Sequence, residues 1–298
     1  MSAKIIDGKF IASKIREKVC RKVEAFKNKN LTPGLTVVQV GDDPASTVYV
    51  LRKEKSAKEL GFNSETIHLP GTVPQQELLS IVDGLNKNPS VHGILVQMPL
   101  PDHIDPNKVI QSISPQKDVD GFHPENVGLM VLGNPRFIPC TPAGIMEMLS
   151  YEEIDPDGKN VVVLGRSNIV GKPMANLLLQ KAAGANATVT ICHTGTKNLL
   201  EHTKRADILI AALGKAHAIK GEYLKEGSIV IDVGVNRLED LSRKSGYRLV
   251  GDVDFDSAKE VASAITPVPG GVGPMTIVML MMNTVKAAEY YKEHLQNE

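Results

Sequence analysis

The sequence has no excess of either charge, few cysteines and no long hydrophobic run. Lysine and arginine together number 34, the same as aspartate and glutamate, so the chain lacks the basic field that attracts nucleic acid or anionic membranes. Its three cysteines, Cys20, Cys140 and Cys192, lie far apart and have no metal-ligand spacing. A sparse and odd set of cysteines is typical of a reducing compartment. We therefore expect no nucleic-acid partner and no metal site.

Membrane and export signals are also missing. The N-terminal MSAKIIDGKF lacks the apolar core of a signal peptide. The most apolar late stretch, from Ile277 to Met282, is far shorter than the roughly 20 residues that span a bilayer. With 298 residues, 42% of them hydrophobic, the chain is expected to be a cytoplasmic globular protein of one large or two ordinary domains.

Strand-like and helix-like segments alternate along the first hundred residues. Asp7 is placed to cap a helix that runs to about Lys29, and Asp43 followed by Pro44 marks the start of another helix. The other expected elements here are strands at 35–40, 66–69 and 91–97 and a helix at 74–86. This βαβ series predicts a mostly parallel sheet.

A proline- and glycine-rich break, GNPRFIPCTP at 133–142, separates this series from a second one. Strands are then expected at 161–164, 187–192, 207–212 and 228–233, and helices at 173–183 and 199–205. Such bare apolar runs suit strands that are covered on both faces. We expect an α/β protein of two lobes, 1–140 and 141–274. By pattern alone, a final helix from about Pro274 to His294 fits either lobe.

The stretch VVVLGRSNIVGKP at 161–173 joins an expected strand to an expected helix. A glycine-led turn in that place presents free N–H groups and the positive end of the helix dipole to a phosphate. Gly165 and Gly171 do not have the usual G-x-G-x-x-G spacing, so a tight turn without a ligand is the competing interpretation.

The following strand bears on which dinucleotide would bind. NAD-binding folds place a carboxylate at the end of this strand to bond the ribose hydroxyls, and ICHTG at 191–195 has none. Instead, His193, Thr194 and Arg166 are chemically suited to a ribose phosphate, although His193 alone is better explained as a loop residue. This chemistry favours NADP over NAD.

Several polar residues in the first half are candidates for chemistry, each with a structural alternative. Tyr49 and Lys53 share one face of an expected helix, where surface positions are the alternative. Gln97 ends an expected strand, where functional residues of such sheets gather. Lys117–Gly121, KDVDG, offers two carboxylates but lacks the further ligands of a calcium loop, so a capped turn competes with a metal site.

Two stretches, 97–101 and 267–274, are dense in proline and glycine. This density indicates rigid turns, with a cis proline among them, and allows a ligand to approach bare backbone.

Taken together, these motifs resemble one family, the bifunctional methylenetetrahydrofolate dehydrogenase/methenyltetrahydrofolate cyclohydrolases. The resemblance covers nearly the whole chain and rests on seven motifs in order: YVLRK, GILVQMPLP, KDVDGFHP, PCTPAGIMEML, GRSNIVGKP, IDVGVNR and TPVPGGVGPMT. It implies an N-terminal αβα catalytic lobe, a Rossmann-like dinucleotide-binding lobe, a cleft between them and a C-terminal helix that returns to the first lobe. It also implies a homodimer.

The resemblance assigns roles by position. Tyr49 matches the tyrosine that packs on the folate rings, Lys53 the lysine required for hydrolysis, Gln97 the glutamine bonded to that lysine, and Asp120 the aspartate that holds the pterin amino edge. Other substrate positions are Val96, Met98, Pro269, Gly270, Gly271, Val272, Gly273, Pro274, Met275 and Thr276. The dinucleotide positions are Gly165, Arg166, Ser167, Thr194 and Val235.

The implied activity is oxidation of methylenetetrahydrofolate by NADP, followed by hydrolysis of the methenyl product to formyltetrahydrofolate, without a metal. This places the protein in one-carbon metabolism and purine biosynthesis. One position departs from the family, since Gly195 stands where a basic residue is frequent; NADP nevertheless remains the expected cofactor, with NAD second. The alternatives are a two-lobed dehydrogenase of a small hydroxy or keto acid and a nucleotide-sensing protein without catalysis.

Overall fold

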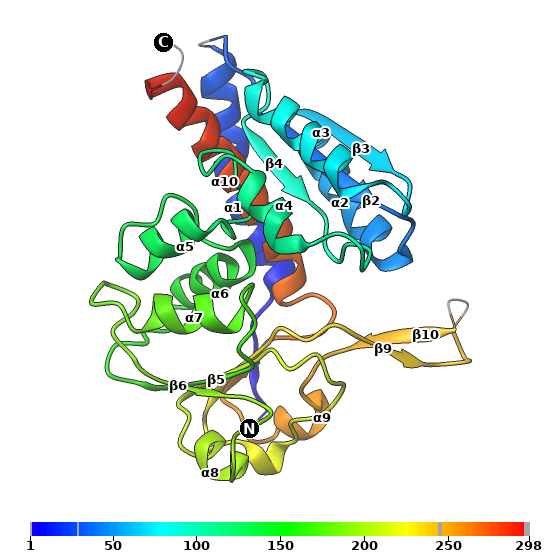
Figure 1. Ribbon diagram of the computed structural model, residues 1–298. Coiled ribbons are helices and arrows are strands. Elements are labelled where there is room, and N and C mark those ends of the chain that lie inside the picture. Colours follow the sequence, from blue (N-terminus) through cyan, green and yellow to red (C-terminus); the bar gives the residue numbers. More distant parts are fainter. Residues whose placement is uncertain (1, 29, 244–245, 295–298) are drawn as a thin grey trace. The chain divides into compact units, whose positions relative to one another are not determined.

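The computed structural model describes residues 2–28, 30–243 and 246–294. The chain divides into two compact units (Figure 1). The first unit contains Lys14–Cys140 and the C-terminal segment from Ile277, and the second contains Thr141–Thr276 and the N-terminal segment up to Ser13. No helix among the described residues combines the length and the apolar character that a membrane span requires.

The first unit is built on a three-stranded parallel sheet in the order β3-β2-β4. Its strands are β2 (Gly34–Val40), β3 (Asn63–Leu69) and β4 (Gly93–Val96), so the three strands expected from the sequence are confirmed. Alternate residues of β2 and β4 point to opposite faces. Val38 and Ile94 pack with helices α3 (Gln75–Lys87) and α4 (Pro106–Ser112), whereas Gly93 lies against Val119 and Thr284 on the other face.

Local signals account for several helices of this unit. Helix α2 (Pro44–Glu59) begins where Asp43 accepts a hydrogen bond from the backbone N–H of Ser46 at 2.7 Å, as the Asp-Pro pair predicts. Helix α3 (Gln75–Lys87) is also confirmed, but α4 (Pro106–Ser112) and α5 (Pro124–Val131) were not expected. Both are short and follow a capping residue, Asp105 or His123.

Two long helices, α1 (Gly8–Lys27) and α10 (Val272–His294), extend from one unit into the other along the chain. Asp7 caps α1 by accepting hydrogen bonds from the N–H groups of Lys9 and Phe10, as expected, whereas the expected end at Lys29 lies outside the described residues. An ion pair between Lys22 and Glu289 joins the two helices within the first unit, where Figure 1 shows them side by side.

The second unit is a doubly wound, all-parallel sheet in the order β1-β11-β8-β7-β5-β6. Its strands are β1 (Lys4–Ile5), β5 (Asn160–Leu164), β6 (Thr188–Cys192), β7 (Ile208–Ala211), β8 (Ile229–Asp232) and β11 (Ala264–Ile265). The expected first lobe, 1–140, includes the N-terminal residues, which in the structure group with the second unit because β1 pairs with β11.

Helices cover both faces of this sheet. On one side lie α6 (Cys140–Tyr151) and α7 (Gly171–Leu178), and on the other α8 (Leu199–Thr203), the 3₁₀ turn Gly221–Tyr223 and α9 (Phe255–Ala258). The expected break at 133–142 overlaps the start of α6 at Cys140. Helix α7 ends at Leu178, before the expected end at Ala183. A separate antiparallel ribbon, β9 (Asn236–Glu239) with β10 (Tyr247–Val250), was not expected.

Candidate active site

A lysine–amide pair lies at the carboxyl end of the sheet in the first unit. Lys53, on α2, is only 9% exposed, and its Nζ donates a hydrogen bond of 2.8 Å to Oε1 of Gln97. Gln97 directly follows β4, and its backbone N–H and side-chain amide bond Val38 O and Met98 O at 2.8 and 2.7 Å. The amide is therefore fixed at both ends, and it fixes the ammonium group in turn. The structure brings together two residues that lie 44 positions apart in the sequence.

The neighbouring expected positions differ in what they present. Tyr49 is half-buried and lies one helical turn before Lys53, on the same face of α2. The side chain of Val96 is buried in the core beneath the sheet, whereas Met98 is half-buried. The bond between Met98 and Pro99 is cis, as the proline-rich sequence suggested.

Asp120 is half-buried near this pair. Burial raises the pKa of its carboxyl group to about 6; the positive charge of Lys53 opposes the rise, and the charge of Asp118 adds to it. The Sγ atom of Cys140 lies 3.8 Å from Oδ1 of Asp120. Near neutral pH the carboxylate form predominates, and it is the form that accepts two hydrogen bonds from a ligand.

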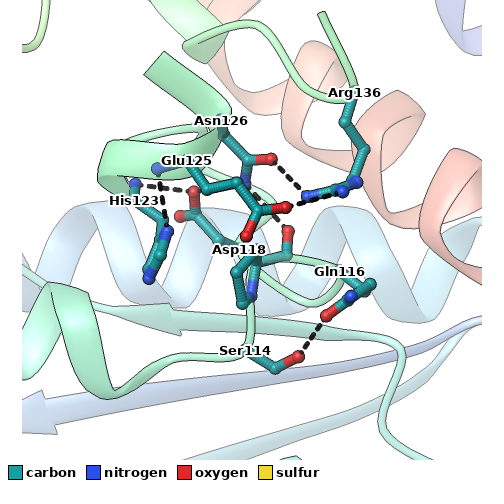
Figure 2. Close-up of polar contacts among 8 residues, drawn as sticks. Ser114, Gln116, Asp118, His123, Glu125, Asn126 and Arg136 are labelled. Carbon is teal, nitrogen blue, oxygen red and sulfur yellow. Dashed lines mark hydrogen bonds and ion pairs between the residues drawn. The ribbon is translucent and has the colours of Figure 1, made fainter. Parts of the chain in front are cut away.

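A buried network holds the loop that carries Asp120 (Figure 2). Asp118 accepts hydrogen bonds from the backbone N–H of His123 and from Nδ2 of Asn126, both at 2.8 Å. Oδ1 of Asn126 accepts a bond of 2.9 Å from Arg136, which also pairs with Glu125 at 2.8 Å. Asn126 has no exposed surface, so this loop is fixed by a fully enclosed amide.

Helix α10 fixes the same loop from a second direction. Nδ2 of Asn283 donates to the carbonyl oxygens of Val119 and Ile138 at 2.8 and 3.0 Å, and Asn283 is 1% exposed. Asp118 and Val119, the two residues before Asp120, are therefore anchored, which favours a precise orientation of Asp120.

In the second unit, a tight glycine-led turn joins β5 to α7. Gly165 has φ +110°, and a Cβ atom there would lie 2.2 Å from the carbonyl oxygen of Ala212. Oγ of Ser167 accepts hydrogen bonds from the N–H groups of Val170 and Gly171 at 3.1 and 3.4 Å. The turn thus needs glycine at Gly165 and a hydroxyl at Ser167, and it leads into a helix N-terminus, where anions bind.

The other expected dinucleotide positions lie on surfaces of the same unit. Arg166 and Thr194 are exposed, and Val235 is 46% exposed in the loop after β8. His193 is half-buried, and its Nδ1 accepts a hydrogen bond from the N–H of Gly195 at 3.1 Å. His193 therefore has a local structural role, in agreement with its interpretation as a loop residue.

The proline-glycine segment at 267–276 forms a tight turn into α10. The bond between Val268 and Pro269 is cis, and Gly270 has φ +115°. Its carbonyl oxygen accepts a hydrogen bond of 3.1 Å from the N–H of Lys9, and Oγ1 of Thr276 lies 3.0 Å from Oγ1 of Thr141. The remaining expected substrate positions of this segment are Gly271, Val272 and Met275, which are buried, and Gly273 and Pro274, which are half-buried.

Comparison with known proteins decides the family. Residues 6–120 match the catalytic domain of the tetrahydrofolate dehydrogenase/cyclohydrolases, and residues 139–292 match the NAD(P)-binding domain of the same family. This chain belongs to the tetrahydrofolate dehydrogenase/cyclohydrolase family. The match confirms the resemblance inferred from the motifs.

Individual family members are similar over almost their whole length. The chain is 59% identical to the bifunctional protein FolD of Prosthecochloris aestuarii over 95% of this chain and 97% of that protein. It is 56% identical to FolD of Bacillus subtilis over 97% and 99%. Among solved structures, FolD of Campylobacter jejuni has a TM-score of 0.91 at 49% identity, covering 97% of this chain and 99% of that one. The Trypanosoma brucei enzyme, solved with NADP and an inhibitor, has a TM-score of 0.93 at 39% identity, covering 98% and 99%.

No cluster of three or more His, Cys, Asp or Glu side chains suited to a metal occurs in the described part of the chain. Further residues support the loop that carries Asp120. Asp118 was read as part of a capped turn, and it does cap the loop, whereas Asn126, Arg136 and Asn283 had no separable signal.

Proposed function

We propose that this chain oxidises methylenetetrahydrofolate with NADP and then hydrolyses the methenyl product to formyltetrahydrofolate. The observation that carries the proposal is the buried Lys53–Gln97 pair near the carboxylate of Asp120. A dehydrogenase alone has no need of a buried lysine held by an amide, whereas a hydrolytic step requires proton transfer.

The oxidative step needs orientation more than acid–base chemistry. When bound, NADP supplies the acceptor for the hydride that leaves the one-carbon bridge of the substrate. The turn from Gly165 to Gly171 leads into the N-terminus of α7, whose positive dipole end suits the phosphates of NADP, and exposed Arg166 and Thr194 are suited to the ribose phosphate. Val235 contributes backbone in the loop after β8.

The hydrolytic step transfers protons, and Lys53 is placed to move them. Water adds its oxygen to the methenyl carbon, the bond from that carbon to N5 breaks, one water proton ends on N5 and the other is released. The ammonium group is held by Gln97 at 2.8 Å, which leaves its other N–H groups directed away from the amide. Lys53 therefore exchanges protons with water and N5 while Gln97 fixes its direction.

Substrate orientation comes from two further residues. The carboxylate of Asp120 accepts parallel hydrogen bonds from the amino edge of the pterin, and Tyr49, on the Lys53 face of α2, packs on the ring system. The segment from Pro269 to Thr276, together with Val96 and Met98, supplies further backbone contacts to the substrate. Gly270, Gly271 and Gly273 in this segment have no side chain, which allows a ligand to approach the backbone closely.

NADP is preferred to NAD because the end of β6 has no carboxylate that would repel a ribose phosphate. Arg166 and Thr194 remain available for that phosphate although Gly195 replaces the basic residue frequent in the family. The alternative substrate class, a small hydroxy or keto acid, leaves Lys53, Gln97 and Asp120 without a common role and is not favoured.

Assembly and cellular setting are part of the same proposal. The β9–β10 ribbon has only two strands and ends near Leu241, which is 86% exposed. Because an isolated two-stranded ribbon is marginally stable, a second copy of the chain is a suitable partner, which gives a homodimer. The cysteines are unpaired, which fits the cytoplasm, where formyltetrahydrofolate serves purine biosynthesis. No nucleic-acid partner is proposed.

Size-exclusion chromatography coupled to light scattering tests the homodimer, because it measures the molar mass of the protein in solution.

A coupled absorbance assay tests the function. The purified chain is mixed with methylenetetrahydrofolate and NADP, and the bands of reduced nucleotide and of the methenyl compound are followed together. We expect the nucleotide band to rise while the methenyl band stays low because hydrolysis removes it. No reduced nucleotide with the folate, but reduction with a panel of hydroxy acids, supports the alternative class.

A further inference from the structure

Two buried aspartates organise the loops at the carboxyl end of the second sheet. Asp232 ends β8 and Asp252 follows β10, and they are 3% and 0% exposed. Neither residue is one of the expected dinucleotide positions. Each nevertheless accepts a hydrogen bond from a residue next to Val235, which is one of those positions.

Asp232 closes the connection between β8 and the residues after β10. Its Oδ1 accepts hydrogen bonds from the N–H groups of Gly234 and Asp252, both at 3.0 Å, and its Oδ2 accepts one from Val253 at 2.9 Å. Burial raises the pKa of Asp232 to about 7, and the nearby charge of Asp252 adds to the rise.

Asp252 holds the turn after β7. Its two carboxylate oxygens accept hydrogen bonds from the backbone N–H groups of Leu213, Gly214 and Lys215 at 2.5, 3.0 and 2.9 Å. Oδ1 also accepts a bond of 2.9 Å from Nδ2 of Asn236. Three backbone donors of the turn on one buried carboxylate fix the turn firmly, and the fourth donor, Asn236, ties it to the start of β9.

The packing around the two carboxylates is matched by glycine. A Cβ atom on Gly234 would lie 2.2 Å from Oδ1 of Asp252, and one on Gly251 would lie 1.8 Å from Oδ2 of Asp232. The carboxylate of each aspartate therefore packs against a glycine that lies close in sequence to the other aspartate. Through these contacts the loops after β7 and β8 are linked to each other.

These loops border the proposed dinucleotide site. Val235 lies between Gly234 and Asn236, which are bonded to Asp232 and Asp252 respectively. The turn after β7 begins at Ala212, whose carbonyl oxygen meets the bare Cα of Gly165 in the phosphate turn. In doubly wound sheets, ligands bind at this edge.

We infer that Asp252, supported by Asp232, is a positioning residue for NADP: it sets the loops at 212–215 and 233–236 in the conformation that the dinucleotide binds. This inference deepens the proposed function and rests on it. Asp252 acts through the backbone of these loops and has no part in the hydrolytic step, which uses residues of the first unit.

The test compares Asp252→Asn with the matched control Asp254→Asn. The first change places an amide NH₂ among N–H donors, so we expect the KM for NADP to rise roughly tenfold or more, while kcat at saturating NADP changes little. Asp254 caps α9 through the N–H of Ser257 at 3.2 Å, and asparagine caps equally well, so the control keeps the wild-type KM.

Hydrolysis of methenyltetrahydrofolate, measured without NADP, is the second readout and should be unchanged in both variants. An unchanged KM for NADP in Asp252→Asn, or an equal loss of both activities in folded protein, overturns the inference. If Asp252→Asn does not fold, Asn236→Ala, which removes a single donor to Asp252, decides: a raised KM for NADP supports the inference and an unchanged KM refutes it. Absence of NADP-dependent oxidation in the wild type would instead reject the proposed function.

Discussion

Replacing Lys53 with methionine should separate the two activities. Hydride transfer needs no proton donor, whereas hydrolysis moves protons from water, so the variant should oxidise methylenetetrahydrofolate and accumulate the methenyl product. Methionine suits the site because Lys53 is 9% exposed and its aliphatic stem fills buried space on α2.

The size of the effect follows from the contacts of the ammonium group. A positioned acid–base group contributes roughly 10²–10⁴-fold to a rate, so hydrolysis should fall by about that factor. The change also removes the donor at 2.8 Å from Oε1 of Gln97. Because Gln97 is only half-buried and can bind water, the cost in stability should be near the lower end of about 1–3 kcal/mol.

The assay follows the methenyl band in two experiments, one starting from methenyltetrahydrofolate and one from methylenetetrahydrofolate with NADP. Lys55→Met is the matched control, because Lys55 is on the same helix with a side chain 78% exposed and 3.9 Å from Glu59. The control should keep both activities. Equal loss of both activities in Lys53→Met at saturating folate would refute the division of labour between the two steps.

Three other predictions concern binding. Arg166→Ala should raise the KM for NADP by one to two decades and that for NAD far less, since a charge-assisted hydrogen bond is worth about 1.5–3 kcal/mol; an equal effect on both cofactors would contradict a contact with the ribose phosphate. Asp120→Asn should weaken a folate analogue by about 1–3 kcal/mol in calorimetric titration and leave NADP affinity unchanged, because the new NH₂ faces a pterin donor; unchanged folate affinity would remove Asp120 from the site. The pKa of Asp120, raised to about 6, means that acid protonates the acceptor, so wild-type affinity for the analogue should fall as the pH drops below about 6. A pH profile identical to that of Asp120→Asn would contradict this.

Much of the fold was predictable because it is specified locally. Asp43 with Pro44 starts a helix by satisfying free N–H groups, and the apolar runs of β2 and β5 read as strands without further knowledge. The short helices α4 and α5 were missed because each supplies barely two turns of pattern. The pairing of β1 with β11 joins residues about 260 positions apart, which no local signal encodes.

The candidate site was predictable only where a motif carried it. Lys53, Gln97 and Asp120 were assigned by resemblance, and the structure brings Lys53 and Gln97 into a hydrogen bond, while the proposed contacts with folate and NADP remain predictions. The supporting residues were not predictable. Asn126 and Asp252 are polar residues with almost no exposed surface, and their roles depend on donors from separate segments.

Isotope transfer in a single reaction reports on both proposed steps, hydride transfer and hydrolysis. The protein is incubated with NADP and methylenetetrahydrofolate deuterated at the bridge carbon, in water enriched in ¹⁸O, and the products are analysed by mass spectrometry. We expect one deuterium on the reduced nucleotide and a formyltetrahydrofolate that retains the other deuterium and carries ¹⁸O, with the ¹⁸O product formed far more slowly by Lys53→Met. A nucleotide without deuterium, or a formyl product formed at the same rate by wild type and Lys53→Met, would contradict this expectation.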